Sequence, residues 1–170
     1  ERYGYYNLVQ KDGTNVILDI GLSEVFSHGS NTKEFKKRCL FYKAEVPKAF
    51  VGNWKKFDED DDAEGKATIS ENGVISTDSD DTDILIAKPL REYLVNKSGK
   101  VDNDKVQKEF DKIQKSLKSH GYQAKSVNDI YHDARKSYYY IVVDGGKRII
   151  ILEDSFNILS IGGYIEREDK

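Results

Sequence analysis

The feature that most constrains this chain is an internal repeat of a β-hairpin pattern. When residue 5 is placed on residue 138, positions 5–29 align with positions 138–162 without a gap and share seven identical residues. We interpret the first copy as the closing strands of one unit, and the second copy as the closing strands of another unit of the same type. The alternative is that any two hairpins share alternating apolar residues around a Gly turn.

A domain boundary is predicted near Val46. Pro47 interrupts strand pairing, because proline cannot donate a ladder hydrogen bond, and an aromatic strand begins soon after it. Residues 1–45 would then be the closing strands of a preceding copy, packed on the main unit, swapped with it or paired with another molecule. Bare strand edges invite such pairing, so strand-mediated self-association is expected. Residues 46–170 form the main unit, whose length is a common domain size.

Most of the main unit is predicted to be strand. Residues 67–71 and 74–77 flank Asn72-Gly73, which is the strongest signal for a two-residue type I′ hairpin. Residues 83–88 read as another apolar strand. A meander is predicted over 138–143, 148–153 and 158–165. The apolar run 148–152 lacks alternation, which indicates a strand covered on both faces.

One amphipathic helix is predicted at about residues 104–119. A capping-box-like start lies at Asp104 to Gln107, and Gly121 ends the helix. Its apolar side chains recur at spacings of four, three and four: Val106, Phe110, Ile113 and Leu117. Weaker helical signals lie at 89–95 and 126–135. We therefore predict a mainly β fold (β+α), an antiparallel meander sheet or small barrel with this helix packed over one face or end.

Composition excludes several classes of partner. With 27 basic and 30 acidic residues the net charge is -3, which does not favour a nucleic-acid-binding face. The apolar runs are too short for a membrane span.

The single cysteine, Cys39, excludes an internal disulfide and a multi-thiolate metal site, and it is interpreted as a small core residue. Because there is no Met and residue 1 is Glu, we expect the chain to be cut from a longer one.

No catalytic residue, metal site or cofactor is predicted. Reading the acidic run 58–62 as an EF-hand places Ala63 where Gly is needed and Ile69 where Glu is needed, so the run is interpreted as a solvated loop. The three histidines lack metal-ligand spacing, and His132-Asp133 is interpreted as a pair in a surface loop. No Gly-rich loop opens a helix after a strand, so no phosphate cradle is indicated.

Aromatic side chains are the candidate ligand contacts. Tyr138, Tyr139 and Tyr140 alternate across a predicted strand, so their rings project to both faces of the sheet. One set can stack on a sugar or another amphipathic ligand, whereas cross-strand aromatic pairing for stability explains the same pattern. Trp54 and Tyr164 complete the set of candidate ligand-binding residues.

The first strand of the main unit carries a family resemblance. Gly52-Asn53-Trp54, followed by strands with Asn-Gly and Asp-Gly turns, resembles the opening of lipocalin-like (calycin-type) β-barrels. Residues 46–54 and 157–165 are similar to uncharacterised exported or lipid-anchored modules of Gram-positive bacteria. The resemblance covers residues 46–170 and implies a small barrel with Trp54 plugging one end. The mid-chain helix departs from the pattern, because lipocalins place theirs near the C-terminal strand.

These observations predict a non-enzymatic module that is extracellular or attached to the surface of a Gram-positive bacterium. Its expected ligand is a small amphipathic molecule, a wall glycan or a protein. A structural spacer without a ligand is the alternative, and a carboxylate-based hydrolase has the least support. An apolar cavity would favour the binder and a filled interior the spacer, whereas two carboxylates about 5–10 Å apart in a cleft would favour the hydrolase.

Overall fold

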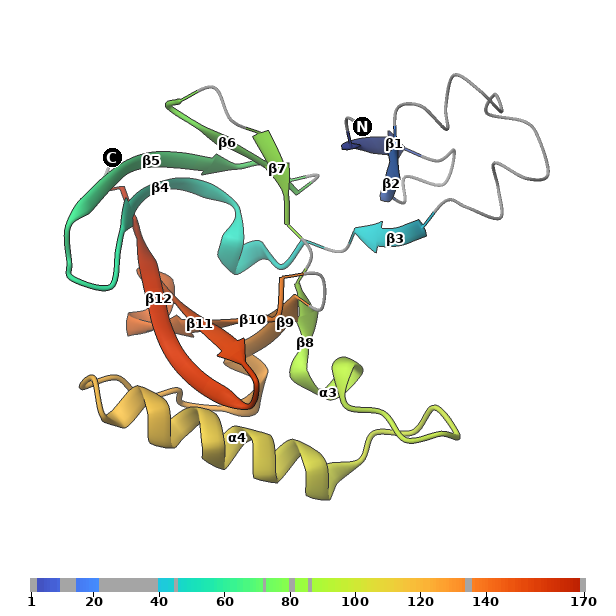
Figure 1. Ribbon diagram of the computed structural model, residues 1–170, viewed down its shortest axis with the longest axis vertical. Coiled ribbons are helices and arrows are strands. Elements are labelled where there is room, and N and C mark those ends of the chain that lie inside the picture. The colour runs from blue at the N-terminus through green and yellow to red at the C-terminus, as the bar shows by residue number, and fades with distance from the viewer. Residues whose placement is uncertain are drawn as a thin grey trace.

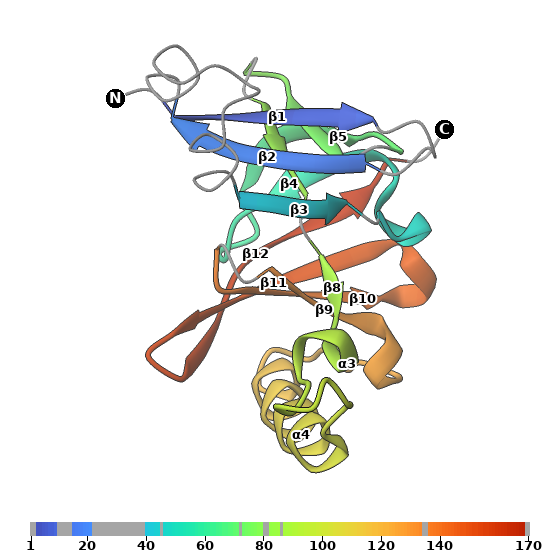
Figure 2. The ribbon, with the colours of Figure 1, turned by 90° about the vertical axis from the view of Figure 1, so that its right-hand side faces the viewer.

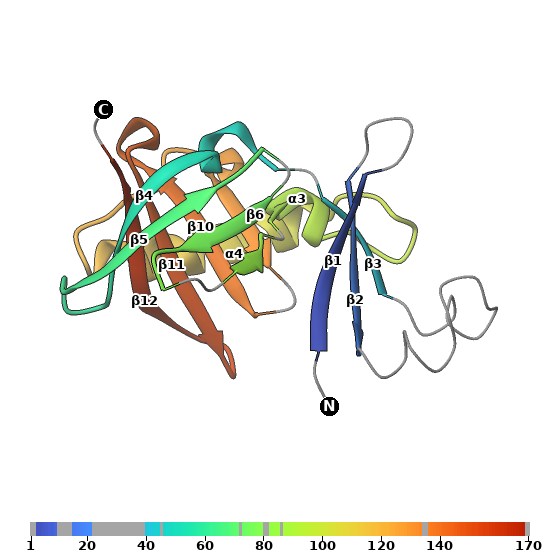
Figure 3. The same ribbon diagram turned by 90° about the horizontal axis from the view of Figure 1, so that it is seen from above.

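The computed structural model describes residues 3–9, 15–21, 40–44, 46–71, 73–79, 82–85, 87–133 and 136–168, and side chains only within the ranges from residue 46 onward. Cys39, His28 and the second half of the first repeat copy lie outside the described residues. A three-stranded antiparallel sheet joins β1 (Tyr3–Val9), β2 (Asn15–Gly21) and β3 (Leu40–Ala44). It is separate from the main sheet (Figure 3).

The main sheet has nine antiparallel strands in the order β7-β6-β5-β4-β12-β11-β10-β9-β8 (Figure 1). Their bounds are β4 Gly52–Phe57, β5 Ala63–Ile69, β6 Val74–Thr77, β7 Thr82–Ile84, β8 Lys88–Pro89, β9 Ile130–Asp133, β10 Tyr138–Val143, β11 Arg148–Ser155 and β12 Ile158–Arg167. The helices are η1 Lys48–Phe50, α3 Leu90–Tyr93, α4 Asn103–Lys118, η2 Val127–Asp129 and η3 Asp144–Gly146. The fold is mainly β, as predicted. No described helix is both long and apolar enough to cross a membrane.

The strand order divides the main sheet into two meanders, β4–β7 and β8–β12. They meet where β4 pairs with β12, with Trp54 opposite Arg167 and Phe57 opposite Tyr164. The other ends of the meanders, β7 and β8, are the two edges of the sheet. Within each meander every strand pairs with the next strand along the chain, although α3 and α4 lie between β8 and β9, and the ladder between β4 and β12 joins the two meanders.

The connection between β7 and β8 requires the sheet to curl. In a flat sheet of nine strands, spacings of about 4.8 Å would place these two edges about 38 Å apart. The chain from Ile84 to Lys88 spans four residues and can reach only about 14 Å. The sheet accordingly forms a half-barrel with its two edges close together (Figure 1). The barrel-like curvature that the sequence predicts is thus present.

The curl gives the sheet an inner face and an outer face, which carry different cores. The helix α4 covers the outer face, and η1 lies within the curl (Figure 1). The outer core combines Val106, Ile113 and Leu117 of α4 with side chains such as Ile141 and Ile150. The inner core gathers around three residues: Phe50, Trp54 and Ile149. The neighbouring residues Ile149 and Ile150 of β11 therefore enter opposite cores. This confirms the prediction that the strand at 148–152 is covered on both faces.

The main helix confirms its prediction except at its start. Its N-cap is Asp102, two residues before the predicted capping box. The Asp102 carboxylate accepts a hydrogen bond from the backbone N–H of Lys105 at 3.2 Å. This backbone donor in the first turn of the helix therefore has its capping partner at Asp102. Phe110 is half-buried against the outer core.

Three local predictions were wrong. Residues 83–88 do not form one strand, because β7 and β8 occupy opposite edges of the sheet. Within the predicted helical segment 126–135, the described residues 126–133 form the short helix η2 followed by β9, whose pairing with β10 overrides the weak helical signal. The β5–β6 hairpin pairs Ile69 with Ile75, and the Ser70 N–H donates to the Val74 carbonyl oxygen at 3.0 Å, so three residues separate Ser70 from Val74 where a two-residue turn was predicted. The slip of one residue places Ile75 on the inner face beside Ile69.

Both segments of the proposed repeat form antiparallel hairpins, β1–β2 and β10–β11. Their registers differ by one residue: Tyr5 pairs with Asp19, whereas Tyr138 pairs with Glu153 instead of the aligned Leu152. The N-terminal strands pair with one another rather than with the main sheet. The repeat, the domain boundary and self-association through these strands stay predictions.

Trp54 and Arg167 hold η1 against the junction of the two meanders. The Trp54 side chain is completely buried, and its Nε1 donates a hydrogen bond to the carbonyl oxygen of Phe50 at 2.8 Å. The guanidinium of Arg167 lies 4.2 Å from the centre of the indole ring. It also donates to the carbonyl oxygens of Val51 and Ala49, each at 2.8 Å. One side chain therefore ties β12, β4 and η1 together.

Replacing Trp54 by Ala is expected to lower the free energy of unfolding by about 3–5 kcal/mol, because a large buried side chain leaves a cavity. Urea unfolding followed by circular dichroism measures this loss. The neighbouring exposed Lys55→Ala variant is the matched control and should stay within about 0.5 kcal/mol of the original chain. A loss below about 1 kcal/mol for Trp54→Ala would contradict the burial described above.

Candidate functional site

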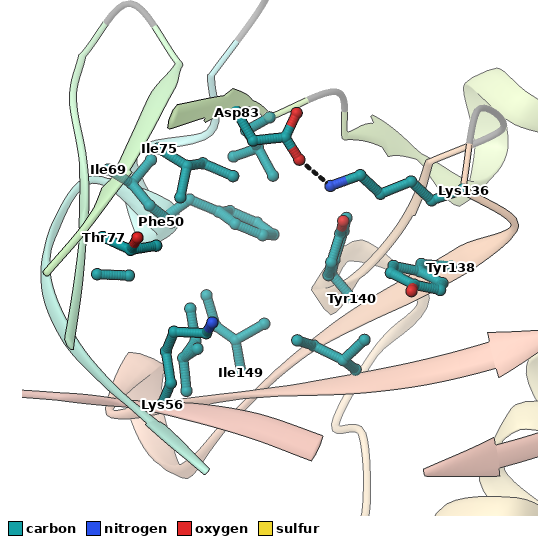
Figure 4. Close-up of a pocket in the computed structure, with 14 residues that line it drawn as sticks. Phe50, Lys56, Ile69, Ile75, Thr77, Asp83, Lys136, Tyr138, Tyr140 and Ile149 are labelled. Atoms are coloured by element: carbon teal, nitrogen blue, oxygen red, sulfur yellow. Dashed lines mark hydrogen bonds and ion pairs between the residues drawn. The ribbon is translucent and has the colours of Figure 1, made fainter. Parts of the chain in front are cut away.

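A cavity of about 270 Å³ opens on the inner face of the main sheet (Figure 4). Both meanders contribute to its wall, so it exists only once the sheet has curled. Its apolar lining consists of Phe50, Ala67, Ile69, Ile75, Leu85, Ile149, Ile151 and Ile165. Its polar lining consists of Lys56, Thr77, Asp83, Lys136, Tyr138 and Tyr140.

The two-residue period of each strand aims these side chains inward. On β4, Lys56 lies two residues after Trp54 and so shares the inner face with it. On β10, Tyr138 and Tyr140 point inward, and the intervening Tyr139 enters the outer core. On β11, Ile149 and Ile151 fill the floor. Apolar residues thus dominate the wall, and the polar groups are few.

An aromatic cluster forms one wall of the cavity. The Phe50 ring meets Tyr140 edge to face, with 5.8 Å between centroids, and meets Tyr131 in the same way at 5.1 Å. Tyr138 packs edge to face on Tyr140 at 6.4 Å. Such perpendicular contacts favour aromatic pairs and fix the rings in place. This wall is therefore preformed rather than assembled around a ligand.

An ion pair closes the rim between the two meanders. The Lys136 amine donates to the carboxylate of Asp83, which lies on β7 (Figure 4). Lys136 precedes β10, so the contact joins segments from opposite sides of the curl. Both side chains are about one-third exposed, which places the pair at the mouth of the cavity. It marks the polar end of a mostly apolar chamber.

Lys56 brings a positive charge into this apolar chamber. Its side chain points into the cavity (Figure 4). Within the part of the chain that the structure describes, its amine has neither an acidic partner nor a hydrogen-bond acceptor. An anion or hydrogen-bond acceptors on a ligand would stabilise such an ammonium group in mostly apolar surroundings. The Lys56 amine is therefore the best-placed group to bind the charged end of a ligand.

The sequence-predicted ligand residues occupy three different environments. Tyr138 and Tyr140 line the cavity. Tyr139 and Tyr164 lie in the outer core, where Tyr164 stacks on Phe57 at 4.9 Å and its pKa is raised to about 12, chiefly by burial. Trp54 lies in the inner core but does not line the cavity. The structure therefore brings two of the five residues together at the site.

Lys56 and the Asp83–Lys136 pair were not among the sequence-predicted site residues. A signal for Lys56 exists, because it follows Trp54 at the two-residue spacing that places both on one face. The ion pair had no local signal, since its residues are far apart in sequence and meet only through the curl.

A second polar cluster lies on the outer face, and it corrects the prediction for His132-Asp133. Both residues are buried, His132 at 5 % exposed and Asp133 at 0 %, because β9 lies within the sheet rather than in a surface loop. The His132 ring stacks on Tyr93, with 3.6 Å between centroids, and tilts against Tyr139 at 4.8 Å. The Tyr139 hydroxyl donates to Glu109 of α4 at 2.8 Å.

Two side chains of this cluster, His132 and Tyr139, have shifted pKa values. Burial lowers the pKa of His132 to about 4, although the carboxylates of Asp154 and Glu109 oppose this shift. Burial also raises the pKa of the Tyr139 hydroxyl, and its hydrogen bond to Glu109 acts in the same direction. At neutral pH the imidazole is therefore uncharged. It is packed between α3 and β10 and lines no described cavity.

The comparisons with known proteins give no relative for this chain. No family model matches it, and neither a curated protein nor a solved structure does.

The His132 pKa predicts that stability falls in acid. The folded-state pKa of about 4 lies below the unfolded value of about 6.5, so between these values the unfolded chain binds a proton that the folded chain does not. Lowering the pH from 7 to 4.5 should reduce the free energy of unfolding by roughly 2 kcal/mol through this residue.

Urea unfolding at several pH values tests the effect in the original chain and in His132→Phe, which retains an aromatic ring but cannot titrate. The exposed His120→Gln is the control. The acid sensitivity should be smaller in His132→Phe and unchanged in His120→Gln. Equal pH dependence in all three chains would assign the acid sensitivity to other groups.

Proposed function

We propose that the half-barrel binds a small amphipathic molecule with an anionic group, held in the inner cavity. The observation that carries this proposal is the Lys56 amine, which lies in an apolar cavity without an acidic partner among the described residues. The apolar walls would take the ligand's hydrocarbon part, and Lys56 would bind its carboxylate, sulfate or phosphate. A compact ammonium suits this role, since it binds anions as a point charge.

The dimensions of the site support a small ligand. Pockets for small molecules usually measure about 300–1,000 Å³, with mostly apolar linings and a few placed polar groups. At about 270 Å³ the cavity is slightly smaller than that range, so it suits a small ligand. Its fixed aromatic wall also reduces the ordering that binding requires.

The other functions have less support from the same geometry. A structural spacer predicts a filled interior, whereas the inner face holds a cavity. A glycan platform predicts exposed ring faces, but Tyr140 is only 7 % exposed and is packed by ring edges. A two-carboxylate hydrolase predicts converging acids. Among the described lining residues Asp83 is the one carboxylate, and it pairs with Lys136.

We also propose that the module is lipocalin-like and is exported or surface-attached in a Gram-positive bacterium. The resemblance of Gly52-Asn53-Trp54 supports this, together with the burial of Trp54 under η1 at the start of a curled sheet. Secretion and lipid attachment rest on the resemblance alone. Fractionation of the source organism into cytoplasm, envelope and medium, with an antibody against the chain, tests the compartment.

Sodium octanoate and 1-octanol test the cavity and its charge separately. Both should shift the NMR signals of the cavity residues. Replacing Lys56 by Gln is expected to weaken octanoate binding about tenfold, because a hydrogen bond to a charged group is lost. Octanol binding should change little, since the alcohol makes no ion pair. The ratio of the two affinities is the quantity to measure.

Two further variants control the experiment. Lys55→Gln removes an adjacent exposed charge and should leave both affinities unchanged. Ala67→Phe fills the cavity and should abolish binding of both compounds. The proposal fails if neither compound shifts the cavity signals at millimolar concentration, or if Lys56→Gln behaves like Lys55→Gln.

A further inference from the structure

The β11–β12 hairpin ends in two exposed apolar side chains. Phe156 is 99 % exposed and Ile158 is 70 % exposed, the largest values among the exposed large hydrophobic residues. The hairpin projects beyond the body of the main sheet (Figure 2). No described residue covers the Phe156 ring, so its whole apolar surface faces solvent.

The turn at this tip is an unfavourable place for Phe. Ser155 pairs with Ile158, which leaves a two-residue turn made of Phe156 and Asn157. Both have positive φ, at 51° and 64°, as a type I′ turn requires. Asn and Gly suit such positions, whereas a bulky side chain is strained there. Neither turn geometry nor core packing therefore accounts for the phenylalanine.

Basic side chains of α4 lie beside the hairpin. A shallow depression between them is lined by Lys112, Lys115, His120, Asn157 and Leu159, among others. Lys115 and its neighbour Lys118 are exposed, and neither has an acidic partner among the described residues. Lys112 lies 3.8 Å from Glu109. A positive patch therefore adjoins the apolar tip, in a chain whose net charge is -3.

We propose that the hairpin tip and the lysines of α4 form a docking surface for an anionic lipid bilayer. Phe156 and Ile158 would enter the interfacial region, and Lys115 and Lys118 would contact anionic headgroups. A projecting tip suits a bilayer, which needs no matching pocket. Two apolar residues are too few for a stable protein interface, which buries at least about 1,000 Å². This surface is independent of the inner cavity and of the function proposed for it.

Vesicle co-sedimentation tests the proposal with equal parts of phosphatidylglycerol and phosphatidylcholine, compared with phosphatidylcholine alone. The chain should bind the anionic vesicles more tightly, and 0.5 M salt, about the level that shortens the Debye length to a few ångströms, should weaken binding. Phe156→Asn should reduce the affinity about tenfold. Lys115→Gln and Lys118→Gln should each reduce it about fivefold.

Two controls separate docking from folding and from general charge effects. Phe156→Asn suits the positive φ, so its melting temperature should not fall. The double variant Lys97→Gln with Lys100→Gln, in the loop before α4, removes two exposed charges away from the tip and should bind the vesicles like the original chain. The proposal is overturned if the original chain ignores anionic vesicles, or if the tip variants bind as well as this control. Sedimentation velocity showing a dimer that Phe156→Asn abolishes would identify a self-association surface instead, and would also overturn it.

Discussion

The short connection between β7 and β8 is the constraint on which the inner face depends. These strands are the two edges of a nine-stranded sheet, yet only a few residues join them, so the sheet must bend until its edges approach. Bending converts one face into a concave wall and exposes the other to α4. The cavity, the aromatic wall and the Asp83–Lys136 contact all follow from that curvature.

Local features of the fold could be predicted because their causes are local. The apolar spacing from Val106 to Leu117 defines α4, and the turn Asp144-Gly145-Gly146 defines the β10–β11 hairpin. The failures lie where strand pairing overrides the local signal. Residues 83–88 divide into two edge strands because β8 pairs with the distant β9, and residues 130–133 become a strand because the neighbouring β10 offers a partner.

The candidate site shows the same division between local and distant causes. Strand alternation correctly separates Tyr140 from Tyr139, and it places Lys56 on the same face as Trp54. Alternation cannot say which face becomes concave, because curvature depends on the whole sheet. It also cannot bring Asp83 to Lys136, since the two meet across the mouth of the finished curl.

The ladder between β4 and β12 has a consequence for how the protein is made. It joins Trp54 to Arg167, more than a hundred residues apart, whereas the other ladders of the main sheet pair strands that follow one another along the chain. During synthesis the first meander can assemble as it leaves the ribosome, but the hydrogen-bonding side of β4 stays bare until the last strand emerges. Long-range closure of this kind slows folding, and it leaves in the nascent chain an unpaired strand edge that can pair with other chains.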